Sequence, residues 1–139
     1  MNPVTQPSHL LAVQRLAQVG SWELDVASQT VYSSVELCRI AGRSLSPEPP
    51  LPLETVLGYV HPEDRQGLEA ALRAIIQTGK PTRLTYRLCR PDGTVRYLEG
   101  QAEALQDRAG RVVKLIGAAQ DITERQQIEL ALRREEIRW

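Results

Sequence analysis

The sequence predicts an α+β domain in which helices cover one face of an antiparallel β-sheet. Over residues 82–123, apolar and polar side chains alternate with period two, the pattern of half-buried strands. Over residues 62–78, apolar side chains recur instead at helical spacing, as Leu68, Leu72 and Ile75 do. Because a half-buried antiparallel sheet needs a cover on one face, we expect this helix to pack against the sheet.

The first expected element is a short helix over residues 8–19. Ser8 can cap its start and Gly20 can end it. Three apolar residues share one face: Leu10, Val13 and Ala17. Because isolated short helices are weak, a frayed leader is an equal alternative.

Two strands and a short helix should follow. Apolar and polar residues alternate over residues 21–26 and predict the first strand, and residues 31–33 predict the second. Ser33 and Glu36 have the spacing of a capping box, which opens a helix over residues 34–41 that the following glycine ends.

The middle of the chain changes from irregular to helical. Residues 43–52 contain four prolines and predict an irregular segment, and residues 53–59 predict one or two helical turns. The long helix over residues 62–78 begins with Pro62, which suits a first helical position, and stops at Gly79.

Three strands complete the sheet, separated by reversals at Pro91-Asp92-Gly93 and at residues 107–110. The last strand runs directly into a helix over residues 124–139, which contains no Gly or Pro. Thr123 can cap this helix through its hydroxyl, and Gln126 completes a capping box. A strand is thus joined rigidly to an outgoing helix.

Four short motifs occur along the chain in this order. They are Gly20-Ser21-Trp22-Glu23-Leu24-Asp25, His61-Pro62-Glu63-Asp64-Arg65, Tyr86-Arg87 before Pro91-Asp92-Gly93, and Ile116-Gly117 before Asp121-Ile122-Thr123-Glu124-Arg125. In this order and spacing, residues 19–125 resemble a PAS domain with a PAC motif. The resemblance implies a five-stranded antiparallel sheet in the order 2-1-5-4-3. Two positions depart from the family's pattern: Gly42-Arg43 stands for the usual Gly-Tyr, and Tyr97 for a common Trp.

The resemblance also implies a domain organisation and a role. We expect a leader at residues 1–19, a PAS domain at residues 20–123 and a signalling helix at residues 124–139. The expected function is a sensory module of a bacterial signalling protein, commonly a histidine kinase or a cyclic-di-GMP enzyme. A change caused by a ligand or partner would pass through Asp121, Ile122, Thr123 and Gln126 into the last helix and a downstream effector. The alternative is a dimerisation or spacer domain that binds no ligand.

We predict no cofactor, no metal site and no catalytic residue in the domain itself. His61 lies just before the long helix, where a capping residue is commoner than a haem ligand. Cys38 lies outside the Asn-Cys-Arg-Phe-Leu-Gln signature of flavin-binding relatives, and Ala119 replaces their glutamine. Glu63 and Asp64 suit the first turn of a helix without any catalytic role. A cofactor-carrying enzyme therefore ranks well behind both other hypotheses.

A small-molecule cavity is the open question. Small residues on the helix-facing side of the sheet can leave room for a ligand, or let a helix pack closely. The candidate cavity residues are Trp22, Tyr32, Leu72, Ile75, Tyr86, Gly100, Ala102 and Gly117.

The last helix is the expected dimer contact. Ile128, Leu132, Glu135 and Trp139 follow nearly heptad spacing, which favours a coiled coil. The alternative is a solvated helix laid back on its own sheet. We expect a homodimer through the two terminal helices, residues 8–19 and 124–139.

Composition excludes several other partners. The formal net charge is zero, whereas nucleic-acid surfaces carry a basic excess. No apolar run reaches the roughly 18 residues that span a bilayer, so we expect no membrane insertion of this segment. Cys38 and Cys89 form no CxxC motif and predict reduced thiols in a cytoplasmic protein.

Overall fold

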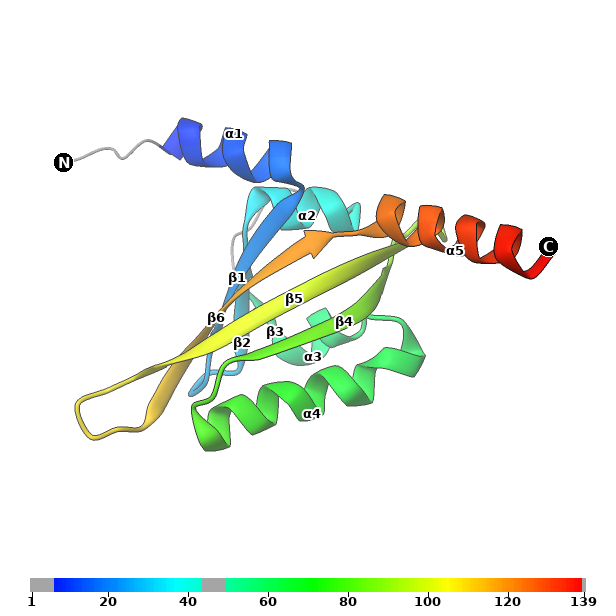
Figure 1. The fold of residues 1–139 in the computed structure, drawn as a ribbon. Coiled ribbons are helices and arrows are strands. Elements are labelled where there is room, and N and C mark those ends of the chain that lie inside the picture. Colours follow the sequence, from blue (N-terminus) through cyan, green and yellow to red (C-terminus); the bar gives the residue numbers. More distant parts are fainter. Residues whose placement is uncertain (1–6, 44–49, 139) are drawn as a thin grey trace.

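A computed structural model describes residues 7–43 and 50–138 and places helices over one face of a twisted antiparallel sheet (Figure 1). The elements in chain order are α1 (Pro7–Ala17), β1 (Val19–Asp25), β2 (Thr30–Ser33), α2 (Val35–Ala41), β3 (Leu51–Pro52), α3 (Leu53–Leu57), α4 (Pro62–Thr78), β4 (Thr82–Cys89), β5 (Val95–Gln106), β6 (Val112–Asp121) and α5 (Thr123–Arg138). The α+β class is as predicted.

The sheet has six strands in the order β3-β2-β1-β6-β5-β4, so the expected count of five is wrong. The five expected strands keep the predicted order, and β3 adds to the edge formed by β2. Thr30 pairs with Pro52, and Val31 pairs with Leu51. A proline is tolerated there because an edge strand needs hydrogen bonds on one side only. Strand β3 was not predicted because a strand of two residues is too short to show an alternating pattern. Within the expected irregular segment, residues 44–49 lie outside the described residues.

The helix boundaries are confirmed where local chemistry is strong. Helix α4 begins at Pro62 and ends at Thr78, and Gly79 takes a φ of 72° as its C-cap. Helix α2 is capped by Ser34 and not by Ser33, since the Ser34 hydroxyl accepts the Leu37 N–H at 3.2 Å. Both serines were available, and only the path of the chain decided between them.

The end of α1 differs from the prediction. The helix stops at Ala17, and Gln18 takes a φ of 57°, so the reversal lies before Gly20. Gly20 instead sits inside β1, where an added β-carbon would lie 2.5 Å from the Leu37 Cβ of α2. The glycine therefore permits a close approach of helix and strand. Ser8, the expected cap, lies inside α1.

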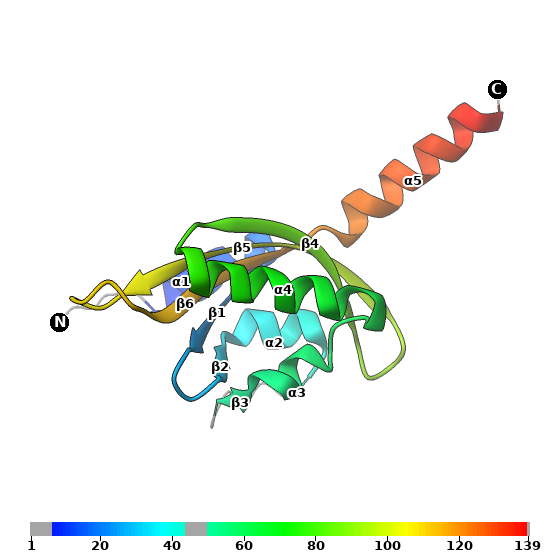
Figure 2. The same ribbon diagram turned by 90° about the horizontal axis from the view of Figure 1, so that it is seen from below.

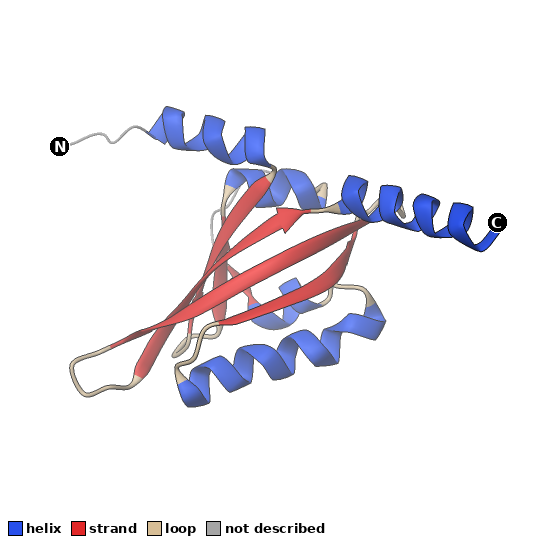
Figure 3. Cartoon of the chain, viewed as in Figure 1, coloured by secondary structure: helices blue, strands red, loops and turns tan. Residues whose placement is uncertain are grey.

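Helices α2, α3 and α4 lie on the same face of the sheet, as Figures 2 and 3 show. Two apolar clusters fill the space between the layers. One gathers Ile40, Ala41, Val60, Tyr86, Leu88, Leu98 and Ala119; the other gathers Leu24, Val31, Leu72, Ile75 and Leu115. Leu68 of α4 packs against both clusters. The predicted inward stripe of the long helix is therefore confirmed.

The terminal helices lie outside this core. Helix α5 leaves the end of β6 and projects away from the domain, and it does not lie back on the sheet (Figure 2). Helix α1 precedes β1 and exposes most of its apolar side chains. None of the helices in the described part of the chain is long and apolar enough to cross a membrane.

Candidate functional site

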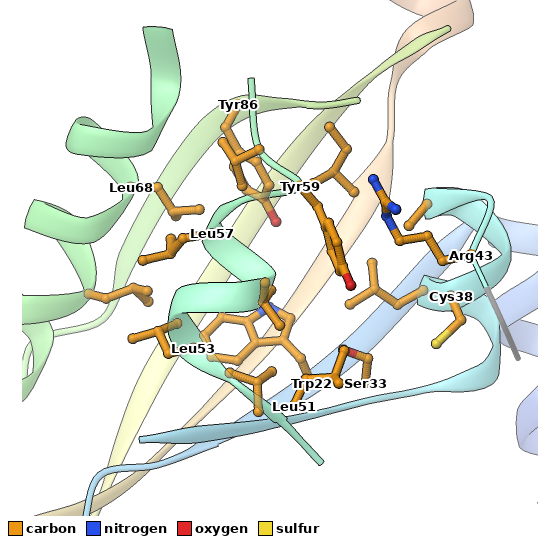
Figure 4. A pocket seen from close by; sticks show the side chains of 17 residues that line it. Trp22, Ser33, Cys38, Arg43, Leu51, Leu53, Leu57, Tyr59, Leu68 and Tyr86 are labelled. Carbon is orange, nitrogen blue, oxygen red and sulfur yellow. The ribbon is translucent and has the colours of Figure 1, made fainter. Parts of the chain in front are cut away.

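A cavity of about 330 Å³ lies between the sheet and helices α2, α3 and α4 (Figure 4). Its lining is mainly aliphatic and aromatic. The lining residues are Trp22, Val31, Ser33, Leu37, Cys38, Ala41, Arg43, Leu51, Leu53, Val56, Leu57, Tyr59, Val60, Leu68, Leu72, Tyr86 and Leu88. A concave, mostly apolar pocket of this size with a few polar groups is typical of small-molecule sites.

The glycines of the sheet set the positions of two cavity rings. Gly117 of β6 pairs directly with Trp22 of β1, and an added β-carbon there would lie 2.1 Å from the Trp22 indole. At Gly100 an added β-carbon would lie 2.9 Å from the Tyr86 ring. Gly100 and Gly117 therefore make room for aromatic rings. This differs from both expected uses of small residues on the sheet, which were to leave space for a ligand or to let a helix pack closely.

The predicted cavity residues separate into three groups. Trp22, Leu72 and Tyr86 line the main cavity. Ile75, Gly100 and Ala102 line a second hollow of about 30 Å³, and some residues of the main cavity line it too. Two candidates do not line either space: Tyr32 and Gly117.

Strand alternation explains the wrong assignment of Tyr32. Val31 and Ser33 take the cavity side of β2, so the side chain between them points to the other face, where it is 40% exposed. The prediction for Gly117 is wrong because the Trp22 ring covers it. Sequence reasoning also missed Cys38, Arg43 and the α3 leucines as lining residues.

Arg43 follows the C-cap of α2 and forms the one cationic part of the described lining. Its Nη2 donates a 3.0 Å hydrogen bond to the Cys89 carbonyl of β4. Its guanidinium carbon lies 3.6 Å from the centre of the Tyr59 ring, a cation–π distance. The Arg43 Nε is buried and has no hydrogen-bond partner. The departure from the family's Gly-Tyr pattern was the sequence signal for this residue.

Burial favours the neutral form of two side chains of the lining, Cys38 and Tyr86. Burial raises the pKa of the Cys38 thiol and raises the pKa of the Tyr86 hydroxyl to about 12. No Asp or Glu is among the described lining residues. The described wall therefore carries one positive charge and no negative one.

The entrance to α4 is held to β4 by charge-assisted hydrogen bonds. Asp64 accepts from the backbone N–H of Arg87 at 2.8 Å and from the Arg87 Nε at 2.9 Å, while Glu63 accepts from the same guanidinium at 3.2 Å. These hydrogen bonds hold the pKa of Asp64 below its usual range. The acidic pair has a structural role here.

His61 caps α4, as the sequence predicted. Its Nδ1 accepts the Glu63 N–H at 3.1 Å, and it does not line the cavity. Within the described residues there is no group of three or more His, Cys, Asp or Glu side chains that could hold a metal ion.

Hydrogen bonds join the junction between β6 and α5 to β5. Asp121 accepts from Arg96 Nε at 2.9 Å, and the Ile122 N–H donates to the Tyr97 carbonyl at 2.8 Å. The buried Thr123 hydroxyl accepts from the Tyr97 N–H at 2.8 Å and lies 2.5 Å from the Asp121 carboxylate. Three consecutive residues are thus each bonded to the neighbouring strand or to one another.

Capping of α5 differs from the expected form. Thr123 is the first residue of the helix, and the Asp121 carboxylate accepts its N–H at 3.0 Å, so Asp121 has the capping role. The Thr123 hydroxyl bonds β5 instead. The backbone N–H of Gln126 donates to the Ile122 carbonyl at 2.9 Å, which is the ordinary i to i−4 hydrogen bond of a helix.

The predicted coiled-coil residues lie on the projecting part of α5. Ile128 and Leu132 are 55% and 59% exposed, and Glu135 is also exposed. Trp139 lies outside the described residues. Leu130 adds a third exposed apolar side chain on another face of the helix.

Comparison with known proteins gives consistent matches. The family model described as the PAS fold matches residues 30–119. The chain is 33% identical over 117 residues to a blue-light-activated histidine kinase of Brucella anthropi, covering 84% of this chain. It is 26% identical over 118 residues to the sensor protein FixL of Bradyrhizobium diazoefficiens, covering 85% of this chain. The chain spans 23% of the length of each of these relatives.

A solved structure agrees over nearly the whole chain. It is a sensory box histidine kinase/response regulator from Burkholderia thailandensis, 28% identical, with a TM-score of 0.74. The match covers 94% of this chain and 98% of that one. Sequence and structure comparisons therefore point to the same fold.

Proposed function

Because the chain belongs to the PAS fold family, we propose that it is a sensory module of a larger signalling protein. A ligand or a partner changes how the helices pack on the sheet. Asp121, Ile122 and Thr123 pass this change into α5, which leads to a downstream effector domain, a histidine kinase in our proposal. The domain itself senses and performs no catalysis.

The observation that carries this proposal is the bonded junction between β6 and α5. Thr123 and Ile122 are both bonded to Tyr97 of β5, so a displacement of the sheet at this end moves the start of the helix with it. A free loop at this position would absorb the same displacement. Because α5 projects from the domain, a small rotation at the junction becomes a larger displacement at its far end (Figure 2).

The cavity lies on the same sheet as the junction. Trp22 lines the cavity and covers Gly117 of β6, four positions before Asp121. A ligand that moves the Trp22 ring would therefore act on the strand that feeds α5. Such a ligand shifts the signal only if it binds the two packing states with different affinities.

The test starts from the purified chain. Denaturation followed by mass spectrometry identifies any small molecule released from the cavity, and an absorption spectrum separates a coloured chromophore from a colourless ligand. Hydrogen exchange is then measured at Glu124–Gln127 with and without the released molecule. We expect a change in amide exchange at these residues. Binding that leaves their exchange unchanged would contradict the relay.

A second candidate is a dimerisation or spacer domain that binds no ligand. It is favoured by the exposed apolar side chains of both terminal helices. In α1 these are Leu10, Leu11, Val13 and Leu16; in α5 they are Ile128, Leu130 and Leu132. We propose that these helices form a homodimer contact under either candidate. The spacer candidate predicts dimers whose cavity releases no molecule.

A further inference from the structure

The strongest unexplained feature of the cavity wall is the Arg43 side chain, whose buried Nε–H has no hydrogen-bond acceptor. Two contacts hold its guanidinium against the wall: the hydrogen bond from Nη2 to the Cys89 carbonyl and the stacking on Tyr59. These contacts leave the Nε–H buried without an acceptor. A buried donor without a partner is destabilising, and it is commonly satisfied by water or by a ligand.

The charge of Arg43 is also unbalanced. The structure gives Arg43 no ion pair among the described residues, although neighbouring arginines have bonds of their own: Arg39 with Glu36, and Arg90 with the Ile40 carbonyl. Cys38 and Ser33, two other polar side chains of the described lining, carry no negative charge that could balance it. A positive charge beside an apolar cavity attracts an anionic group more strongly than it would in water.

The cavity has a polar side and an apolar side. Figure 4 shows Cys38 of α2 and Arg43, which follows the C-cap of α2, on one side of the space, and Leu53, Leu57 and Leu68, from α3 and α4, on the other. The Tyr59 ring stands between them. A ligand that satisfies both sides has one anionic end and one apolar body.

We propose that the cavity binds a small amphipathic monocarboxylate whose carboxylate pairs with the Arg43 guanidinium and whose apolar body lies among the leucines of α3 and α4. This inference rests on the proposed sensory function and names its ligand class. A phosphate fits less well, because a dianion beside a single cation would keep an uncompensated charge in an apolar space. A neutral ligand would leave the guanidinium charge unbalanced.

The test uses matched probes that differ only in charge. Octanoate is compared with octanamide and 1-octanol, and 3-phenylpropanoate with 3-phenylpropan-1-ol, by calorimetry and by the shift in melting temperature. We expect one or both acids to bind and to raise the melting temperature, and each neutral analogue to bind on the order of tenfold more weakly or worse, as the loss of a charged hydrogen bond implies.

Variants assign the effect to Arg43. Arg43→Gln should weaken acid binding on the order of tenfold and leave binding of the alcohols unchanged. Arg43→Lys keeps the charge but loses the planar guanidinium that stacks on Tyr59, so its affinity for the acids should fall between those of the wild type and Arg43→Gln. Arg83→Gln removes an exposed charge on β4 and serves as the control, with binding unchanged. If Arg43→Gln does not fold, the comparison of acids with alcohols on the wild-type chain decides.

The inference is overturned if neither acid binds, if an alcohol binds as tightly as its acid, or if folded Arg43→Gln binds the acids normally. Failure of the sensory proposal is a separate result. If the molecule released from the purified chain is neutral and changes exchange at Glu124–Gln127, the carboxylate inference falls and the sensory proposal stands. If octanoate binds through Arg43 and exchange does not change, the reverse holds.

Discussion

Single residues decide where the rings of the cavity lie. Trp22 rests on Gly117, and Tyr86 rests beside Gly100, at distances that leave no space for a β-carbon at either glycine. Arg87 similarly ties two elements through one side chain, because its guanidinium and its N–H both meet Asp64 at the start of α4. Each of these contacts joins residues that are distant in sequence, and each can be tested by one substitution.

Gly117→Ala should destabilise the domain by about 1–3 kcal/mol, since the new methyl group would overlap the Trp22 indole and force it to move. Urea unfolding gives the stability, and tryptophan fluorescence in a Trp139→Phe background reports the Trp22 environment. Gly67→Ala is the matched control. Nothing lies within 4 Å of its new methyl group, and it is inside α4, so it should stabilise by roughly 0.5–1 kcal/mol. Equal effects of the two substitutions would refute the contact argument.

Asp64→Asn should lower stability at neutral pH by about 1–2 kcal/mol, the order expected for a partly exposed charged hydrogen bond. Because the folded-state pKa of Asp64 is below the ordinary value of 3.8, its stabilising effect is present above that value and is lost as pH falls through the folded pKa.

Urea unfolding at pH 7, 5, 4 and 3 measures this pH dependence. Stability of the wild type should fall more steeply than that of Asp64→Asn as pH drops below the ordinary aspartate pKa. Glu69→Gln removes an exposed ion pair with Arg73 and should cost less than about 0.5 kcal/mol. Parallel pH profiles of wild type and Asp64→Asn would show that the Arg87 contact does not perturb Asp64.

At the scale of elements, the important connection is between β6 and α5. A helix of 16 residues that projects into solvent gains little stability from its own sequence. Its first turn is therefore stabilised mainly by the Asp121 carboxylate and by bonds to β5. The helix should fray from its far end while its start remains ordered, which is the arrangement that a relay requires.

Thr123→Val should weaken this junction by about 1–2 kcal/mol, because the partly buried Tyr97 N–H loses its acceptor while the side-chain volume is kept. Hydrogen exchange at Glu124–Gln127 should become faster, while exchange in α4 should stay as in the wild type. Thr85→Val, on the exposed side of β4, is the control and should change neither measurement. Unchanged exchange at the start of α5 in Thr123→Val would contradict the role of the hydroxyl.

At the scale of the whole molecule, the described part of the domain has two apolar core clusters, a cavity of about 330 Å³ between sheet and helices, and two terminal helices with exposed apolar residues. Leu16 of α1 is 79% exposed, more than any other large apolar residue in the described chain. The proposed homodimer would cover these exposed apolar side chains.

The proposed homodimer can be tested by sedimentation. Ile128→Asn combined with Leu132→Asn should shift the wild-type dimer toward monomer by removing the apolar contact on α5, and Leu16→Asn should do the same through α1. Leu105→Asn is the control, because Leu105 is also an exposed apolar residue but lies at the end of β5 that is far from the junction with α5. A wild-type chain that sediments as a monomer, or an equal loss of dimer in Leu105→Asn, would exclude this interface.

Local chemistry in the sequence was sufficient for much of the fold. The limits of α4 follow from Pro62 and Gly79, and the strand pattern of residues 82–123 follows from alternation, because both signals act over a few neighbouring residues. The order of the five longer strands came from the family resemblance. The third strand, β3, was missed because its two residues carry no pattern.

The cavity was decided by the tertiary structure. Trp22, Leu72 and Tyr86 were among the cavity residues predicted from the sequence, but Arg43 and Cys38 were not, and the prediction included Tyr32, whose side chain does not line the cavity. The alternation of a four-residue strand does not show which face is inward until its partners are known. The orphaned Arg43 Nε likewise exists only because Cys89 and Tyr59, distant in sequence, hold the guanidinium in place. Short-range preferences thus determined the elements, and long-range packing determined the site.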